Sequence, residues 1–244
     1  MPVLEGVGVS KYFGGVVALS NVSFHVDDGE IVGLIGPNGA GKTTLFNVIC
    51  CFYPLNSGVI KFKGEKITGL KPHQVCRKGI ARTFQITRSF ANMSVVDNVM
   101  IGALFGKEAQ GNLKSAREEA MRLMGFIGLI EKADMPVESL TSIDARRLEL
   151  VRALAAKPKV LLLDEVLAGL NPSEVAEAME LIRRLRDEMG ITIFMVEHIM
   201  KSVMGISDRV IVLADGQQIA DGTPKEVSAD PSVIQAYLGG AEER

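Results

Sequence analysis

The sequence predicts an α/β fold built on a parallel sheet, and two features carry this prediction. Residues 31–35 are an apolar run that leads through a glycine-rich loop into an apolar helix. Residues 159–163 form a second, nearly continuous apolar run, which is typical of a strand buried on both faces of a parallel sheet. A third apolar run, residues 191–196, is predicted to be the next strand.

The glycine-rich loop fits a phosphate-binding pattern. Residues 36–43 match G-x-x-x-x-G-K-[ST] in full, between a predicted strand and a predicted helix. Glycines let several backbone N–H groups point into one concavity, and the helix N-terminus adds partial positive charge. A glycine-rich turn without a ligand is the alternative, but the strand and helix argue against it. The predicted nucleotide-binding residues are Gly36, Pro37, Asn38, Gly39, Ala40, Gly41, Lys42, Thr43 and Thr44.

Two side chains of this loop have expected partners. The Lys42 ammonium can reach the outer phosphates of a nucleotide, and the Thr43 hydroxyl can bind Mg²⁺. The sequence therefore predicts a nucleoside triphosphate and Mg²⁺ as ligands.

The composition excludes several classes of protein. The chain has 244 residues, and its net charge of −2 is not the basic balance of a nucleic-acid-binding protein. Its three cysteines lack metal-binding spacing, so we interpret them as reduced thiols. The N-terminus lacks a signal-peptide pattern and no run of about 18 apolar residues occurs, so we expect a cytoplasmic chain that does not span a membrane.

We expect one domain over residues 1–244, in which a helical subdomain interrupts a sheet-containing core. Residues 1–85 and 158–244 form the predicted core, and residues 86–157 form the predicted helical subdomain. The strand patterns of the N-terminal part lie at 3–9, 17–26 and a hairpin over 58–67. The helical patterns of the insert lie at 94–105, 113–133 and 141–157.

The C-terminal part has clear helix and turn signals. Asn171 precedes Pro172 and Glu174, which is the pattern of a capped helix start, and Gly190 is the predicted end of that helix. A hairpin over 209–220 and two short helices after Thr223-Pro224 and Asp230-Pro231 complete the chain.

An aromatic residue precedes the phosphate loop in a predicted glycine turn. Phe13, with Tyr12 as the alternative, stands before Gly14-Gly15. Its ring could stack on a nucleotide base, because every base presents a π-face. The alternative is a turn aromatic that covers the core.

Polar residues follow two of the predicted parallel strands. Asp164 can hold Mg²⁺, directly or through water, and Glu165 is the first candidate to orient and deprotonate an attacking water. His198 also follows a strand, so it is predicted at the ligand edge of the sheet. On the residues alone, a structural role for His198 stays open.

Five elements in order resemble the ATP-binding-cassette (ABC) ATPases. They are the aromatic Phe13, the phosphate loop, Gln85, the pair Asp164-Glu165, and His198. The resemblance covers nearly the whole chain. It implies an ABC ATPase fold with a RecA-like parallel-sheet core, an N-terminal antiparallel β subdomain and a helical subdomain. Residues 164–172 and 196–200 look like the ATPase subunits of branched-chain amino acid importers.

The resemblance also implies residue roles and partners. It assigns Gln85 to Mg²⁺ and to sensing a transmembrane partner, Glu165 to the attacking water, and His198 to the γ-phosphate. The implied ligands are ATP and Mg²⁺. The implied partners are a second ABC ATPase subunit, transmembrane permeases and, indirectly, an extracytoplasmic binding protein, which places the chain on the inner face of the cell membrane.

One sequence motif of the family is altered in this chain. The family expects Leu-Ser-Gly-Gly-Gln before Asp164, where this chain has Leu140, Thr141, Ser142, Ile143 and Asp144. In the family, this signature closes over ATP held on the other subunit. The Asp144 carboxylate would repel a phosphate charge by about 3 kcal/mol at roughly 6 Å and an effective dielectric of about 20. We therefore expect a heterodimer with two unequal composite sites.

Two other functions are also compatible with the sequence. A soluble, non-transport ABC ATPase would share the same motifs, although such proteins usually carry two cassettes or a long coiled-coil insert. An ATP-binding subunit with little hydrolytic activity of its own would fit the altered residues 140–144.

Overall fold

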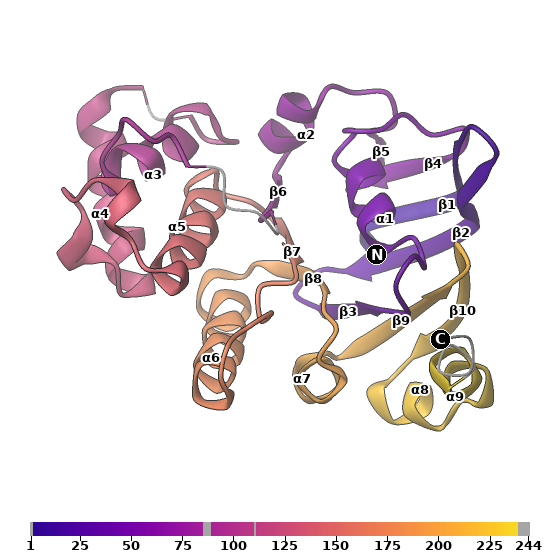
Figure 1. Ribbon diagram of the computed structural model, residues 1–244. Coiled ribbons are helices and arrows are strands. Elements are labelled where there is room, and N and C mark those ends of the chain that lie inside the picture. Colours follow the sequence, from indigo (N-terminus) through magenta and orange to yellow (C-terminus); the bar gives the residue numbers. More distant parts are fainter. Residues whose placement is uncertain (1, 85–88, 110, 239–244) are drawn as a thin grey trace. The chain divides into compact units, whose positions relative to one another are not determined.

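The computed structural model describes residues 2–84, 89–109 and 111–238. The chain divides into two compact units. The first comprises the described residues of Met1–Pro72 and Leu167–Arg244, and the second those of His73–Val166. Both contain strands and helices, so the α/β class predicted from the sequence is confirmed (Figure 1).

The first unit begins with an antiparallel sheet. Its strands lie in the order β2-β1-β4-β5, and β1, β2 and β4 run side by side in Figure 1. Gly14 and Lys63-Gly64 adopt positive φ in the tight turns of its hairpins. The bounds are β1 (Pro2–Phe13), β2 (Val16–Asp27), β4 (Ser57–Phe62) and β5 (Glu65–Lys66).

The same unit contains part of a mainly parallel sheet, in the order β10-β9-β3-β8. Strand β3 is parallel to both β8 and β9, and β10 is antiparallel to β9. Every residue of β3 and β8 is buried, and both strands lie where the apolar runs 31–35 and 191–196 predicted them. The bounds are β3 (Ile31–Ile35), β8 (Thr192–Val196), β9 (Arg209–Ala214) and β10 (Gln217–Gly222).

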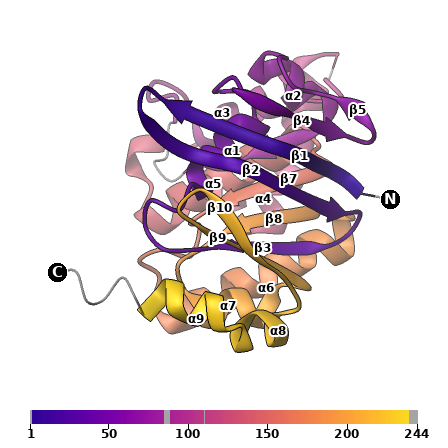
Figure 2. The ribbon, with the colours of Figure 1, turned by 90° about the vertical axis from the view of Figure 1, so that its right-hand side faces the viewer.

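The described residues of this unit form five helices that lie wholly within it. Helix α6 starts as predicted, because Asn171 and Glu174 form a reciprocal capping box, and it ends at Gly190 in the left-handed conformation. Helices α7, α8 and α9 lie together on the side of β3 and β9 away from β1 and β2 (Figure 2). The bounds are α1 (Lys42–Ile49), α6 (Pro172–Met189), α7 (Met200–Ile206), α8 (Pro224–Ala229) and α9 (Pro231–Leu238).

The second unit joins a parallel strand pair to a helical group. Strands β6 and β7 are hydrogen-bonded in parallel, and α3, α4 and α5 pack on one another. An added Cβ at Gly102 of α3 would lie 2.4 Å from the Arg152 carbonyl oxygen of α5, so the helix backbones approach closely there. The bounds are α2 (Pro72–Lys78), β6 (Ile80–Arg82), α3 (Val95–Phe105), α4 (Leu113–Ile127), the 3-10 helices η1 (Ile130–Lys132) and η2 (Val137–Ser139), α5 (Ser142–Ala155) and β7 (Val160–Asp164).

Two local predictions need correction. The helix predicted over 113–133 ends at Ile127, because Gly128 adopts φ 78° and its N–H caps the helix. Lys11, Tyr12 and Phe13 are strand residues of β1 and not part of a glycine loop, since Phe13 pairs with Val16 across a two-residue turn. Pairing between β1 and β2 extends both strands of this hairpin beyond the residues in which apolar and polar side chains clearly alternate.

None of the helices formed by residues 2–84, 89–109 and 111–238 has the length and apolar character needed to cross a bilayer. The three cysteines form no disulfide, and burial raises the pKa of the Cys51 and Cys76 thiols.

Candidate functional site

The phosphate loop is held in a backbone conformation that only glycine adopts easily. Gly36, Gly39 and Gly41 have φ of 152°, 80° and 99°. An added Cβ at Gly36 would lie 2.0 Å from the Leu213 carbonyl oxygen, and one at Gly41 would lie 2.5 Å from that of Ala18. Gly39 has open space around it. Gly36 and Gly41 are therefore required for two reasons, because neighbouring backbone atoms leave no room for a Cβ and because φ is positive.

Lys42 and the N-terminus of α1 supply the positive charge at the end of this loop. Lys42 is only 6% exposed, and its Nζ donates to the carbonyl oxygens of Gly36 at 2.7 Å and Pro37 at 3.0 Å. No side chain caps the N-terminus of α1. The first N–H groups of α1 are therefore suited to binding phosphate. The exposed Thr43 hydroxyl is suited to binding a metal ion.

The predicted base-stacking residue sits at the end of strand β1. Phe13 is 42% exposed, so its ring does not simply cover the core. Its ring meets that of Tyr53 edge-on at 5.2 Å, and Lys11 Nζ lies 4.8 Å from its centroid. The sequence did not indicate Tyr53, because 40 positions separate the two aromatics.

Asp164 ends strand β7 and is already ion-paired. Its Oδ2 accepts a hydrogen bond from Arg82 Nη2 at 2.6 Å, and its backbone N–H donates to Thr83 Oγ1 at 3.2 Å. Glu165 follows in the left-handed region with φ 52°. Such strain in a non-glycine residue is typical of functional positions.

His198 follows β8 and is exposed, as expected of a residue at a strand end. Its neighbour Glu197 is only 2% exposed, and Glu197 Oε1 accepts from the backbone N–H of Leu167 at 2.8 Å. Leu167 comes two positions after Glu165 in the chain. Sequence reasoning missed Glu197 as a support for this segment; its only signal was a carboxylate adjoining a buried strand.

The donor set fits Mg²⁺ better than a soft metal. Thr43 and Asp164 offer hard oxygen ligands, which Mg²⁺ prefers, and Mg²⁺ usually takes few protein ligands beside substrate phosphates. Across the described ranges, no three His, Cys, Asp or Glu side chains gather into a metal-binding group. The third predicted metal-site residue, Gln85, lies outside the described residues.

The altered signature is a capped helix start. Thr141 is the N-cap of α5, and its Oγ1 accepts from the Asp144 backbone N–H at 3.2 Å and donates to Asp144 Oδ2 at 2.6 Å. Lys132 Nζ makes an ion pair with the same Oδ2. This cation changes the electrostatic expectation, because a neutralised carboxylate repels phosphate less than an isolated one. Leu140 precedes the cap, and Ser142 and Ile143 form the first turn.

The site residues fall in both units. Phe13, the phosphate loop and His198 belong to the first, whereas Asp164, Glu165 and residues 140–144 belong to the second.

Two family models match the sequence. One, described as ABC transporter, matches residues 19–168, and one described as branched-chain amino acid ATP-binding cassette transporter matches residues 217–243. The first match contains the phosphate loop and Asp164-Glu165, and the second contains β10, α8 and α9.

Bacterial transport proteins match this chain over nearly its whole length. The high-affinity branched-chain amino acid transport ATP-binding protein BraF of Pseudomonas aeruginosa is 40% identical, over 98% of this chain and 99% of its own length. The corresponding LivG of Salmonella typhimurium is 42% identical with the same coverage.

Solved structures match as well. A nucleotide-free ATP-binding cassette from an ABC transporter aligns with a TM-score of 0.88 and 31% identity, over 97% of this chain and 99% of its own. The ADP conformation of the cassette MJ1267 also aligns with a TM-score of 0.88 and 31% identity, over 98% and 99%.

Proposed function

This chain belongs to the ABC transporter family, and from that premise we propose that it hydrolyses ATP to energise a membrane importer for branched-chain amino acids or related amino acids and amides. The phosphate loop carries this proposal. Residues 31–49 fold as strand, glycine loop and helix, with a buried lysine at the helix start. The names of the two bacterial relatives support the class of cargo.

We assign the chemistry to residues by the type of group each supplies. The backbone N–H groups within residues 36–44, of which Pro37 has none, and the Lys42 ammonium bind the phosphates, and Phe13 stacks on the base. Glu165 orients a water and accepts its proton as the water attacks the γ-phosphorus, releasing ADP and phosphate. His198 hydrogen-bonds the γ-phosphate.

Mg²⁺ would be held by Thr43, Gln85 and Asp164, and when bound it neutralises charge that develops on the phosphates. Arg82 Nη2 donates to Asp164 Oδ2 at 2.6 Å, and this contact holds the carboxylate in place at the end of β7.

The proposed assembly is asymmetric. This chain would pair with a different ATPase subunit, bind permeases at the inner face of the membrane, and act on an extracytoplasmic binding protein only through them. Residues 140–144 support unequal sites, because Ile143 places a β-branched side chain where the family has glycine. Under this arrangement the site on this chain's phosphate loop turns over, and the opposite site is weak.

The activity is tested by two variants in the reconstituted importer. Lys42→Ala should abolish Mg-ATP binding, whereas Glu165→Gln should bind Mg-ATP and hydrolyse it at least a hundredfold more slowly. Glu118→Gln, an exposed carboxylate of α4, is the matched control and should behave as wild type. Substantial turnover by Glu165→Gln would reject this residue as the base, and Mg-independent ATP binding would reject the site.

The asymmetry is tested separately. Ile143→Gly with Asp144→Gln should raise ATP turnover of the complex if the second site is impaired. Unchanged turnover, or a fully active homodimer of this chain, would argue against unequal sites.

A further inference from the structure

A second aromatic ring lies against Phe13. Residues 50–56 join the end of α1 to the start of β4, and they bring Tyr53 to the end of β1. The ring centroids of Phe13 and Tyr53 are 5.2 Å apart and the ring planes meet at 83°, which is the edge-on arrangement that aromatic pairs prefer. Such a pair is worth more than the burial of its two rings, so each ring restricts the orientation of the other.

The segment 50–56 is fastened to β1 and to α1 by hydrogen bonds. The Tyr12 N–H donates to Asn56 Oδ1 at 2.9 Å, and the Asn56 N–H donates to the Ser10 carbonyl oxygen at 3.0 Å. The Tyr53 N–H donates to the Asn47 carbonyl oxygen of α1 at 3.4 Å. Tyr53 is therefore placed by bonds to the strand that carries Phe13 and to the helix that begins at the phosphate loop.

A cation lies at the same ring. Lys11, two residues before Phe13 in β1, is only 8% exposed, and its Nζ lies 4.8 Å from the centroid of the Phe13 ring. Phe13 is nevertheless 42% exposed. The ring is thus held by two neighbours of different kinds and still offers a surface on which a base could stack.

We propose that Tyr53 is a positioning residue for the nucleotide base, because its ring holds the Phe13 ring in the orientation that stacks on the base. The proposal rests on the proposed function, in which Phe13 makes that stack. Without the Tyr53 ring, the Phe13 side chain would spend part of its time in other rotamers. Apparent affinity falls in proportion to the binding-competent fraction, so loss of Tyr53 weakens nucleotide binding without removing any contact to the nucleotide.

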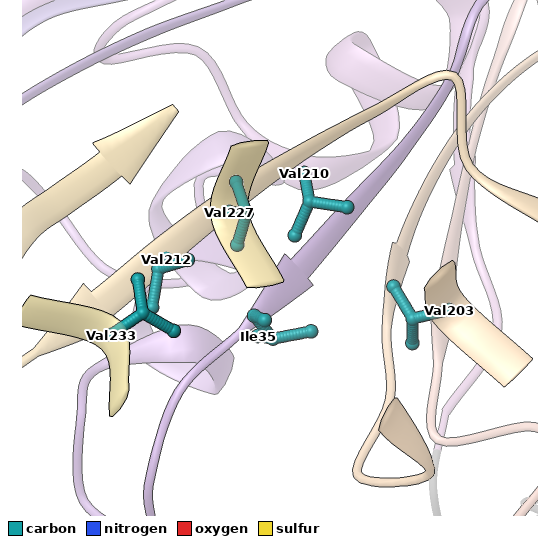
Figure 3. Close-up of a cluster of buried hydrophobic side chains, with 6 residues drawn as sticks. All are labelled: Ile35, Val203, Val210, Val212, Val227 and Val233. Atoms are coloured by element: carbon teal, nitrogen blue, oxygen red, sulfur yellow. The ribbon is translucent and has the colours of Figure 1, made fainter. Parts of the chain in front are cut away.

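The phosphate loop has a separate support. Ile35, which precedes Gly36, lies in a buried cluster formed by β3, β9, α7, α8 and α9 (Figure 3). The members of this cluster are Ile35, Val203, Val210, Val212, Val227 and Val233. Because these residues come from other elements than the segment 50–56, a change at Tyr53 should leave the phosphate loop in place. We therefore expect a loss of affinity for the base and not for the phosphates.

The ring contact is tested first without nucleotide. The chain contains no tryptophan, so Phe13→Trp introduces a single fluorescent reporter at the end of β1. Adding Tyr53→Leu should free the indole and lower its fluorescence anisotropy, whereas adding Tyr53→Phe keeps an aromatic ring and should leave the anisotropy unchanged. Equal anisotropy in all three proteins would overturn the proposal.

Mg-ATP binding to the full chain tests the functional part. Tyr53→Leu should weaken binding about fivefold, the effect of losing one aromatic pair, and Tyr53→Phe should bind as wild type. Phe52→Leu removes an exposed ring at the neighbouring position and is the matched control, with wild-type affinity expected. In Phe13→Ala, the further change Tyr53→Leu should have no effect, because the ring that it positions is gone. A fivefold loss in that background would show that Tyr53 contacts the nucleotide itself, and it would overturn the positioning role.

Mg-tripolyphosphate, which carries linked phosphates and no base, separates positioning from general damage. Tyr53→Leu should bind it as wild type does. Equal losses for tripolyphosphate and ATP, or wild-type affinity of Tyr53→Leu for ATP, would overturn the proposal and leave the proposed function standing. Wild-type affinity of Phe13→Ala for ATP would reject the base stack and the proposal with it. Failure of the wild-type chain to bind Mg-ATP would instead reject the proposed function.

Discussion

Arg82 and Asp164 form a buried ion pair, with Arg82 Nη2 2.6 Å from Asp164 Oδ2 and both side chains about 5% exposed or less. They come from the adjacent parallel strands β6 and β7. The Asp164 carboxylate, which we assign to Mg²⁺ binding, is therefore already stabilised by the guanidinium of Arg82 in the same unit. A buried carboxylate needs such compensation, because desolvation penalises the charge strongly.

The first prediction concerns this pair. Arg82→Met should lower the free energy of unfolding by about 3 kcal/mol, because it leaves the Asp164 carboxylate buried and uncompensated. The double variant Arg82→Met with Asp164→Asn should regain part of this loss. Urea denaturation at neutral pH without Mg²⁺ measures both. Asp164→Asn alone completes the cycle, and a double variant that loses the sum of the two single effects would show that the pair is not coupled.

The second prediction concerns Glu197. Its buried carboxylate accepts from the Leu167 N–H, so Glu197→Ala should loosen the segment after Glu165 and lower kcat for ATP about tenfold. Glu197→Gln keeps an acceptor oxygen and should retain most of the activity. Steady-state kinetics of the assembled importer provide the measurement. Equal losses in the two variants would assign the effect to charge and not to the hydrogen bond.

Much of the fold could be predicted because its signals are local. The ABC ATPase fold expected from the motifs is confirmed. The apolar run 31–35 became β3, and Asn171, Pro172 and Glu174 start α6 as expected. The Asp215-Gly216 turn also appears as predicted, with both residues at positive φ. Each of these features is specified by residues that lie close to one another in the sequence.

The contacts that support the site could not be predicted in the same way. Arg82 and Asp164 are 82 positions apart, and Leu167 and Glu197 are 30 positions apart. Lys132 neutralises Asp144 from a separate 3-10 helix, so the sequence indicated a repulsive charge without its partner. Such pairs depend on tertiary packing, which a single sequence does not encode as a pattern.

The third prediction compares two glycines of the phosphate loop. Gly36→Ala should destabilise the chain by about 3 kcal/mol or more, because its Cβ would collide with the Leu213 carbonyl. Gly39→Ala meets no atom within 4 Å and has only its φ of 80° to accommodate, so about 1 kcal/mol is expected. Urea denaturation of both variants is the measurement. Equal destabilisation would contradict the described loop conformation.

The last prediction follows from the pKa of Asp144. Burial disfavours its carboxylate, but hydrogen bonds from Lys132 and Thr141 outweigh burial and hold the pKa below its ordinary value of 3.8. A lowered folded-state pKa stabilises the fold above the unfolded value, and this contribution is lost as pH falls through the folded value. Wild type should exceed Asp144→Asn in unfolding free energy by about 1 kcal/mol at pH 7, since Lys132 is partly exposed and screened. The difference should shrink below pH 3.8. Lys132→Ala should flatten the same pH dependence, and a difference that stays constant down to acid pH would show that the carboxylate's charge is not what stabilises the start of α5.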